Sequence, residues 1–131
     1  MGWSFARILG VVVAVAGFAG CALQSAPKSD DAVVEARAKE RWQALVAGDV
    51  PKAYEFLSPG SKTVYSLDLY RNGMRPGFWK AVDIEKVECA GDICEVSTQM
   101  SYVYNGMAIK TPAKESWIRE KGVWWYLHKS W

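Results

Sequence analysis

Hydrophobic positions in the first part of the chain recur with the period of a helix. The positions that share one helical face are Val34, Ala38, Trp42 and Leu45. This spacing predicts an amphipathic helix. Either Asp30 or Asp31 can cap its N-terminus, because a carboxylate accepts hydrogen bonds from the free N–H groups of the first turn. Gly48 suits the left-handed conformation that follows the end of a helix.

Two shorter helical segments are predicted beyond Gly48. Asp49 is the expected N-cap of the first, and Pro51 lies in its first turn, where no N–H donor is required. Residues 58–61, Ser-Pro-Gly-Ser, are expected to end that helix. Residues 66–72 predict one or two further helical turns, which the Asn72-Gly73 pair closes.

Beyond residues 76–77 the pattern changes to the two-residue alternation of strands. The predicted strands span about residues 78–89, 93–104, 107–120 and 123–131. One face of the second carries Cys94, Val96, Met100, Tyr102 and Tyr104, and one face of the last carries Trp124, Tyr126 and His128. Asn105-Gly106 and Lys121-Gly122 predict tight turns. Pro112 must lie at a sheet edge or in a bulge, because it has no N–H to donate.

Helices followed by an antiparallel meander predict an α+β fold, in which the N-terminal helices pack on one side of a four-stranded sheet. Strands of this length must curve to cover both a helix and their own aromatic side chains. The aromatic load is heavy, with seven Trp in 131 residues. One domain is predicted at residues 32–131, preceded by a signal peptide at 1–20 and a tether at 21–31.

The longest apolar run of the chain lies near its N-terminus. Arg7 precedes residues 8–20, which are apolar or small. A basic start, an apolar core and small residues before a cleavage site are typical of a secretory signal peptide, and the run is short for a membrane span of about 20 residues. Cys21 follows this run. One interpretation is an ordinary secretory signal peptide that is cleaved near Cys21, and the alternative is described next.

The segment Phe18-Ala19-Gly20-Cys21 resembles the lipobox of bacterial lipoproteins, although the family prefers Leu where Phe18 stands. The resemblance implies that Cys21 is diacylated, becomes the new N-terminus and attaches the protein to a membrane through lipid such as palmitate. Ala22 is not the Asp associated with inner-membrane retention. We therefore expect a bacterial lipoprotein on the periplasmic leaflet of the outer membrane.

The remaining cysteines, Cys89 and Cys94, flank a Gly91-Asp92 turn signal, and an exported compartment permits disulfides. A disulfide across a hairpin is predicted. Two thiols and a single distant histidine are too few for a metal site, so no metal or cofactor is expected. The chain has 16 Lys and Arg against 14 Asp and Glu without a run of one sign, which argues against nucleic-acid binding.

Three segments resemble the nuclear transport factor two-like (SnoaL-like, cystatin-like) superfamily. They are residues 41–49 and 53–59, which are helical, and 122–130, which matches the closing strand. The resemblance implies a cone-like domain whose long curved sheet wraps around the first helix. Its cone mouth often holds a pocket, and its outer sheet face often makes dimers. Isomerases, dehydratases and non-enzymatic proteins share this fold, so the resemblance leaves the function open.

An enzyme of this fold would need a positioned acid or base in the cone. The candidates are Asp68, Asp83, Glu85, Tyr102, Tyr104, Glu115 and His128. His128 could serve as a general base, but a lone histidine on an aromatic face is more often a packing residue. The acidic residues of the first strand alternate with Val82, Ile84 and Val87, as on a solvated strand face. No Ser/His/Asp order, metal spacing or Gly-rich phosphate loop is present.

We therefore predict a lipid-anchored periplasmic accessory protein without enzymatic activity. It would dock a protein partner, form a homodimer or hold a small apolar ligand. The side chains expected to form the pocket or interface are Tyr102, Tyr104, Trp124, Tyr126 and His128. The alternative is a periplasmic isomerase or dehydratase that uses an acid or base in the cone.

Overall fold

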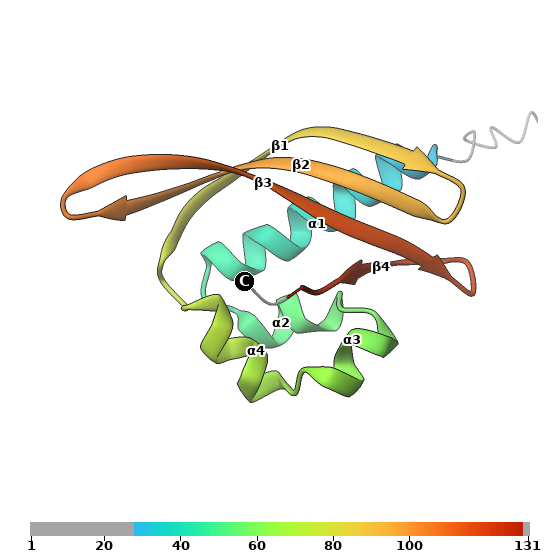
Figure 1. Ribbon diagram of the computed structural model, residues 1–131, viewed down its shortest axis with the longest axis horizontal. Coiled ribbons are helices and arrows are strands. Elements are labelled where there is room, and N and C mark those ends of the chain that lie inside the picture. The colour runs from blue at the N-terminus through green and yellow to red at the C-terminus, as the bar shows by residue number, and fades with distance from the viewer. Residues whose placement is uncertain (1–27, 130–131) are drawn as a thin grey trace, which may run out of the picture.

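The computed structural model describes residues 28–129 (Figure 1). The predicted signal peptide, Cys21, the tether up to residue 27 and residues 130–131 lie outside the described residues. The helices are α1 (Asp30–Val46), α2 (Val50–Glu55), α3 (Pro59–Val64) and α4 (Leu67–Met74). The strands are β1 (Trp79–Ala90), β2 (Ile93–Tyr104), β3 (Met107–Glu120) and β4 (Val123–Leu127). The predicted α+β fold is confirmed.

Helix α1 buries the predicted apolar face, since Val34, Ala38, Trp42 and Leu45 all lie in the core. Its N-cap is Ser29 and not one of the two aspartates, because the Ser29 hydroxyl accepts a hydrogen bond from the Ala32 N–H at 3.3 Å. The helix therefore begins at Asp30, inside the segment that was predicted to be tether. Gly48 has the expected positive φ of 79°.

The three short helices follow one another along the chain. Asp49 caps α2 as predicted, accepting from the Lys52 N–H at 3.2 Å. Helix α3 was not predicted: Ser58 accepts from the Ser61 N–H at 3.0 Å and starts a new helix, so the Ser-Pro-Gly-Ser stretch is a beginning as well as an end. Helix α4 continues through Asn72-Gly73 to Met74, beyond its predicted end.

The sheet is a four-stranded antiparallel meander in the order β1-β2-β3-β4. Strands β2 and β3 have the predicted bounds, whereas β4 ends at Leu127, before the predicted residue 131. Asn105 and Gly106 have φ of 49° and 76°, the positive pair that a tight hairpin turn requires. Pro112 pairs with Gln99 of β2, while β4 pairs only with residues 116–120 of β3. Pro112 therefore lies at a local sheet edge, as predicted.

Irregularities in β1 keep its apolar residues on the helix side of the sheet. Trp79, Val82, Ile84 and Val87 all pack against the core, although the first two and the last two are three residues apart. The pairing with β2 shifts between Trp79 and Ala81 and between Ile84 and Lys86, so one residue is inserted each time. Such bulges also bend a strand and increase its twist, which helps the sheet to curve around α1.

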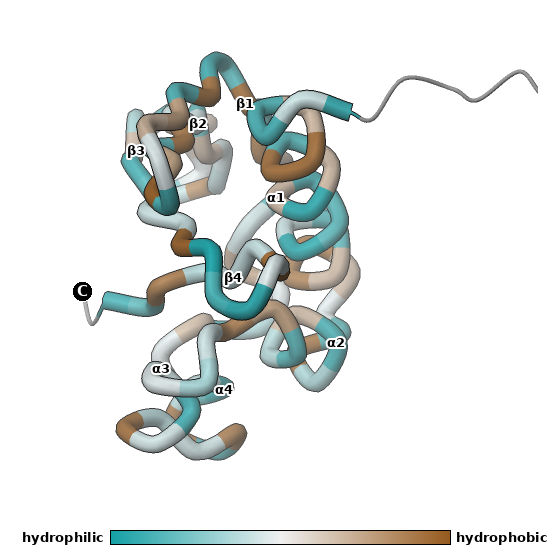
Figure 2. Tube along the Cα trace, turned by 90° about the vertical axis from the view of Figure 1, so that its right-hand side faces the viewer, coloured by the Kyte–Doolittle hydropathy of each residue, from teal (hydrophilic) through white to brown (hydrophobic). Residues whose placement is uncertain are grey.

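Strand β4 connects the sheet to the short helices. Its Tyr126 forms a parallel bridge with Leu57, in which the Tyr126 N–H donates to the Phe56 carbonyl and the Ser58 N–H donates to the Tyr126 carbonyl, both at 2.8 Å. In Figure 1, α1 lies under β1 and β2, and in Figures 1 and 2 α3 and α4 lie on the far side of β4. The β2–β3 hairpin extends well past α1 (Figure 1, left).

No helix within residues 28–129 combines the length and the apolarity that crossing a bilayer demands.

Candidate functional site

A buried ion pair links α1 to the sheet. Arg41 of α1 donates from Nη1 to Oε1 of Glu115 on β3 at 2.7 Å, and their side chains are 0% and 2% exposed. Trp117 Nε1 donates to the other oxygen of Glu115 at 3.3 Å, and Arg41 Nη2 donates to the Tyr70 hydroxyl at 3.3 Å. We call Arg41, Tyr70, Glu115, Trp117 and Tyr126 the buried cluster.

Burial and neighbouring charges shift the pKa values of Arg41 and Tyr126 in the buried cluster. Burial lowers the pKa of Arg41, but the neighbouring Glu115 carboxylate and the Tyr126 ring raise it by more, so the guanidinium stays charged. This guanidinium lies 3.6 Å from the centre of the Tyr126 ring. Burial also raises the pKa of Tyr126 to about 12. Arg41 and Tyr126 therefore keep their protons near neutral pH. The buried cluster presents no surface to a substrate.

A groove opens beyond the buried cluster, at the mouth of the cone. This mouth groove has a volume of about 350 Å³. It is lined by Gly73, Arg75, Phe78, Trp79, Met100, Tyr102, Thr111, Pro112 and Ala113. The Phe78 and Tyr102 rings stack with centres 4.8 Å apart, and Trp79 meets Tyr102 edge-on at 5.9 Å. The lining is thus largely apolar and aromatic.

A second cavity, of about 340 Å³, adjoins the mouth groove and shares Gly73 and Arg75 with it. Its other lining residues are Tyr65, Leu69, Asn72, Met74 and His128. Arg75 follows α4 in the left-handed conformation, with φ of 47°. This backbone turn places Arg75 between the two cavities, where it is the only Lys or Arg among the described residues that line them.

His128 is half-buried among tyrosine rings. The centre of its ring is 4.5 Å from that of Tyr65 and 5.1 Å from that of Tyr70. Burial, and then the positive charge of Arg41, lower the pKa of His128 to about 4. The imidazole is therefore neutral at pH 7. A base with such a low pKa is poorly matched to neutral conditions, which argues against His128 as a general base.

A third cavity, of about 660 Å³, lies between α1 and the free edge of β1. Its charged lining residues are Lys39, Lys80 and Asp83. Asp83, Tyr102 and His128, which were candidate acids or bases, thus line three separate cavities. Glu115 is buried and paired, while Asp68 and Glu85 are exposed. Within the described residues these groups form no shared acid–base arrangement.

The residues predicted to form a pocket or interface therefore separate into three groups. Tyr102 lines the mouth groove and His128 the adjoining cavity. Trp124 and Tyr126 lie in the core instead, because β4 turns this face towards α1. Tyr104 is exposed at the tip of the β2–β3 hairpin. The sequence reasoning missed Arg75, Phe78 and Trp79, whose aromatic pair next to a Pro-Gly turn was the available signal.

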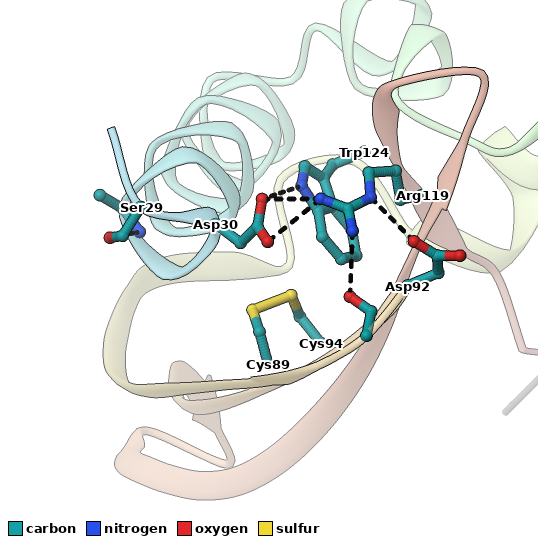
Figure 3. A network of polar contacts seen from close by, with 9 residues as sticks. Ser29, Asp30, Cys89, Asp92, Cys94, Arg119 and Trp124 are labelled. Atoms are coloured by element: carbon teal, nitrogen blue, oxygen red, sulfur yellow. Dashed lines mark hydrogen bonds and ion pairs between the residues drawn. A yellow bond between two sulfur atoms is a disulfide. The ribbon is translucent and has the colours of Figure 1, made fainter. Parts of the chain in front are cut away.

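The predicted Cys89–Cys94 disulfide is confirmed, at the end of the molecule opposite the mouth groove. Beside it, Arg119 donates to both carboxylate oxygens of Asp30, at 3.0 and 3.1 Å, and to Asp92 at 2.9 Å (Figure 3). Trp124 Nε1 also donates to Asp30, at 3.3 Å. This network joins the first turn of α1 to the β1–β2 hairpin. No three His, Cys, Asp or Glu side chains in residues 28–129 are placed to hold a metal ion.

Comparison with solved structures places the fold. A SEC-C motif protein from Rhodopseudomonas palustris is similar over 74% of this chain and 77% of its own, with a TM-score of 0.62 and 16% identity. One from Psychrobacter arcticus has a TM-score of 0.61 and 12% identity, over 80% of this chain and 63% of its own. A Campylobacter jejuni protein described as an NTF2-like transpeptidase has a TM-score of 0.54 and 16% identity, over 73% and 98%.

No protein-family model and no curated protein sequence matches this chain. At the identities of the structural neighbours, the likeness concerns the fold alone. It supports the predicted NTF2-like architecture.

Proposed function

We propose that this protein is a lipid-anchored envelope protein that binds a small apolar ligand in the mouth groove and catalyses no reaction. The observation that carries the proposal is the aromatic lining of this groove by Phe78, Trp79 and Tyr102. Ligand pockets are typically concave, mostly apolar and a few hundred Å³ in volume, with a small number of polar groups that orient the ligand. The mouth groove has all of these properties.

The contrast with the rest of the cone supports this choice of site. Arg41, Glu115 and Trp117 of the buried cluster are packed in the core, so a ligand cannot reach them. At the mouth, by contrast, β2 and β3 continue past α1 and leave Met100, Tyr102 and Thr111 facing a cavity. Burial of a ring system against these side chains would contribute about 25 cal/mol for each Å² of apolar surface removed from water.

A neutral fluorescent dye tests the groove. N-phenyl-naphthylamine, which brightens in apolar surroundings, should bind the protein saturably. Thr111→Trp places a large ring inside the groove and should weaken binding at least tenfold. Lys110→Trp is the matched control, because the neighbouring residue of β3 lies on the opposite, exposed face. Equal dye affinity in the two variants would contradict the proposed site.

The anchor is tested separately. The sequence Phe18-Ala19-Gly20-Cys21 supports lipidation of Cys21, and Ala22 supports placement on the periplasmic leaflet of the outer membrane. Cys21→Ser should remove the lipid, so that the protein leaves the membrane fraction or accumulates with its signal peptide uncleaved. Mass spectrometry and fractionation measure both. An unchanged mass and membrane fraction would refute the lipoprotein assignment while leaving the groove untouched.

Protein docking is the second candidate function, and the β2–β3 hairpin tip favours it. Val103, Tyr104 and Met107 are 50%, 58% and 62% exposed, so three large apolar side chains lie in contact with solvent at one hairpin tip. If the tip joins two copies, light scattering should show a dimer that the double variant Tyr104→Ser/Met107→Ser converts to a monomer. A monomer at all concentrations would exclude self-association through the tip.

A further inference from the structure

Arg75 is the one cationic side chain at the mouth groove. It lines this groove and the adjoining cavity, and its guanidinium carbon lies 5.8 Å from the centre of the Phe78 ring. None of the described residues that line either cavity is acidic. The shared rim of two largely apolar cavities therefore carries a positive charge with no counter-charge in their walls.

Three other arginines of the domain have carboxylate partners. Arg41 pairs with Glu115 at 2.7 Å, Arg71 with Asp68 at 2.9 Å and Arg119 with Asp30 at 3.0 Å. Arg75 forms no ion pair with any residue in the range 28–129. Its guanidinium is consequently free to pair with a group from outside the chain.

Two buried polar atoms on residues that line the cavities lack a hydrogen-bond partner among the described residues. They are Nε1 of Trp79, whose side chain lines the mouth groove, and Nδ1 of His128, whose side chain lines the adjoining cavity. Buried indole N–H groups usually find an acceptor, as those of Trp117 and Trp124 do here. The mouth groove thus combines aromatic walls with a cation that has no ion-pair partner among residues 28–129.

We infer that the ligand of the mouth groove is a ring compound that bears an oxyanion, such as a carboxylate or a sulfonate. Its rings would lie against Phe78, Trp79 and Tyr102, and its anionic group would pair with the Arg75 guanidinium. A guanidinium binds two oxygens of such an oxyanion through two parallel N–H donors, which fixes the orientation of the ligand as well as neutralising its charge. This inference rests on the proposed function, because it names the ligand class of the same site.

Two dyes that share one hydrophobic body test the inference. Anilinonaphthalene sulfonate is N-phenyl-naphthylamine with a sulfonate added, so the ratio of their affinities isolates the contribution of the anion. The wild-type protein should bind the sulfonate roughly tenfold more tightly than the neutral dye, the lower end of what charge-assisted hydrogen bonds provide. Arg75→Gln should reduce this ratio to about one, and Arg75→Lys should keep part of it.

Arg71→Gln is the matched control. It removes a positive charge from α4 itself, but Arg71 lines neither cavity, so the affinity ratio should stay at its wild-type value. Rising salt should lower the affinity of the wild-type protein for the sulfonate and leave that for the neutral dye unchanged, since ions screen an exposed charge. This salt measurement needs no variant and therefore holds even if Arg75→Gln fails to fold.

The outcomes separate the two claims. If Thr111→Trp abolishes binding of the neutral dye but the wild-type protein shows no preference for the sulfonate, the inference is overturned and the proposed function stands. The inference is also overturned, with the proposed function intact, if the preference survives Arg75→Gln or is insensitive to salt. If neither dye responds to Thr111→Trp, the proposed function fails and the inference fails with it.

Discussion

Arg41 and Arg75 lie in neighbouring regions on the concave side of one sheet, yet their surroundings differ. Arg41 is fully buried and bound to a carboxylate, whereas Arg75 is exposed between two cavities without an ion-pair partner in residues 28–129. Burial of a charge requires compensation, and Glu115 provides it. An arginine therefore has a structural role in one region of the cone, where its charge is neutralised, and is available to a ligand in the other, where its charge has no partner.

The difference follows from what covers each part of the sheet. Helix α1 packs over the part of the sheet that contains Val96, and β4 extends the sheet beside residues 116–120 of β3. Beyond Pro112, towards the β2–β3 turn, β3 has no further strand beside it, and the hairpin runs past the end of α1. Inner-face residues near the hairpin therefore line a cavity instead of a core.

The largest effect on stability is expected from a substitution in the buried cluster. Arg41→Met would leave the Glu115 carboxylate buried and unpaired, and we expect a loss of about 3–5 kcal/mol in the free energy of unfolding, measured by urea denaturation. The double variant Arg41→Met/Glu115→Leu should recover most of this loss, because no charge is then left in the core. A single variant as stable as wild type would show that the pair is not buried in solution.

Removal of the disulfide should have a smaller effect. Cys89→Ser/Cys94→Ser opens a short loop, for which the chain-entropy estimate is about 2 kcal/mol of stability. The bond lies away from the mouth groove, so the affinity for the neutral dye should be unchanged in the folded variant. Loss of dye binding without unfolding would mean that the shape of the mouth groove depends on the disulfide at the opposite end of the molecule.

The pH dependence of stability tests the surroundings of His128, which lies between the two regions. Its pKa is lowered from 6.5 to about 4, by burial and then by Arg41. The folded protein therefore binds this proton less readily than the unfolded chain. His128 contributes stability that is complete above pH 6.5 and is lost as the pH falls towards 4. His128→Gln should make the urea midpoint depend less on pH over this window. The same dependence on pH in the variant and the wild type would contradict the lowered pKa of His128.

The smallest effect is expected at Arg75. Arg75→Met repeats the substitution made at Arg41, but it removes no buried pair, so stability should change by no more than about 0.5 kcal/mol. Urea denaturation of the two variants side by side measures the contrast directly. A cost at Arg75 that approached the cost at Arg41 would show that Arg75 is structural and would remove the basis for an anionic ligand.

Local pattern was enough to predict much of this architecture. The buried face of α1, the alternation in β2, the Asn105-Gly106 turn and the Cys89–Cys94 bond all depend on residues close together in the chain. Helix α3 was missed because Ser58 can both follow one helix and cap the next. The mouth groove was predicted only in part, through Tyr102, because its walls come from α4 and three strands.

The sequence by itself therefore determined the class of fold, the positions of most elements and the partner of each paired cysteine, since periodicity and turn chemistry are properties of neighbouring residues. Only the tertiary structure decided which charges are neutralised. Arg41 and Glu115 are 74 residues apart in the chain, and nothing local indicates that they meet. The pairing of one arginine and the freedom of another depend on how the sheet curves around α1, and that curvature is a property of the whole domain.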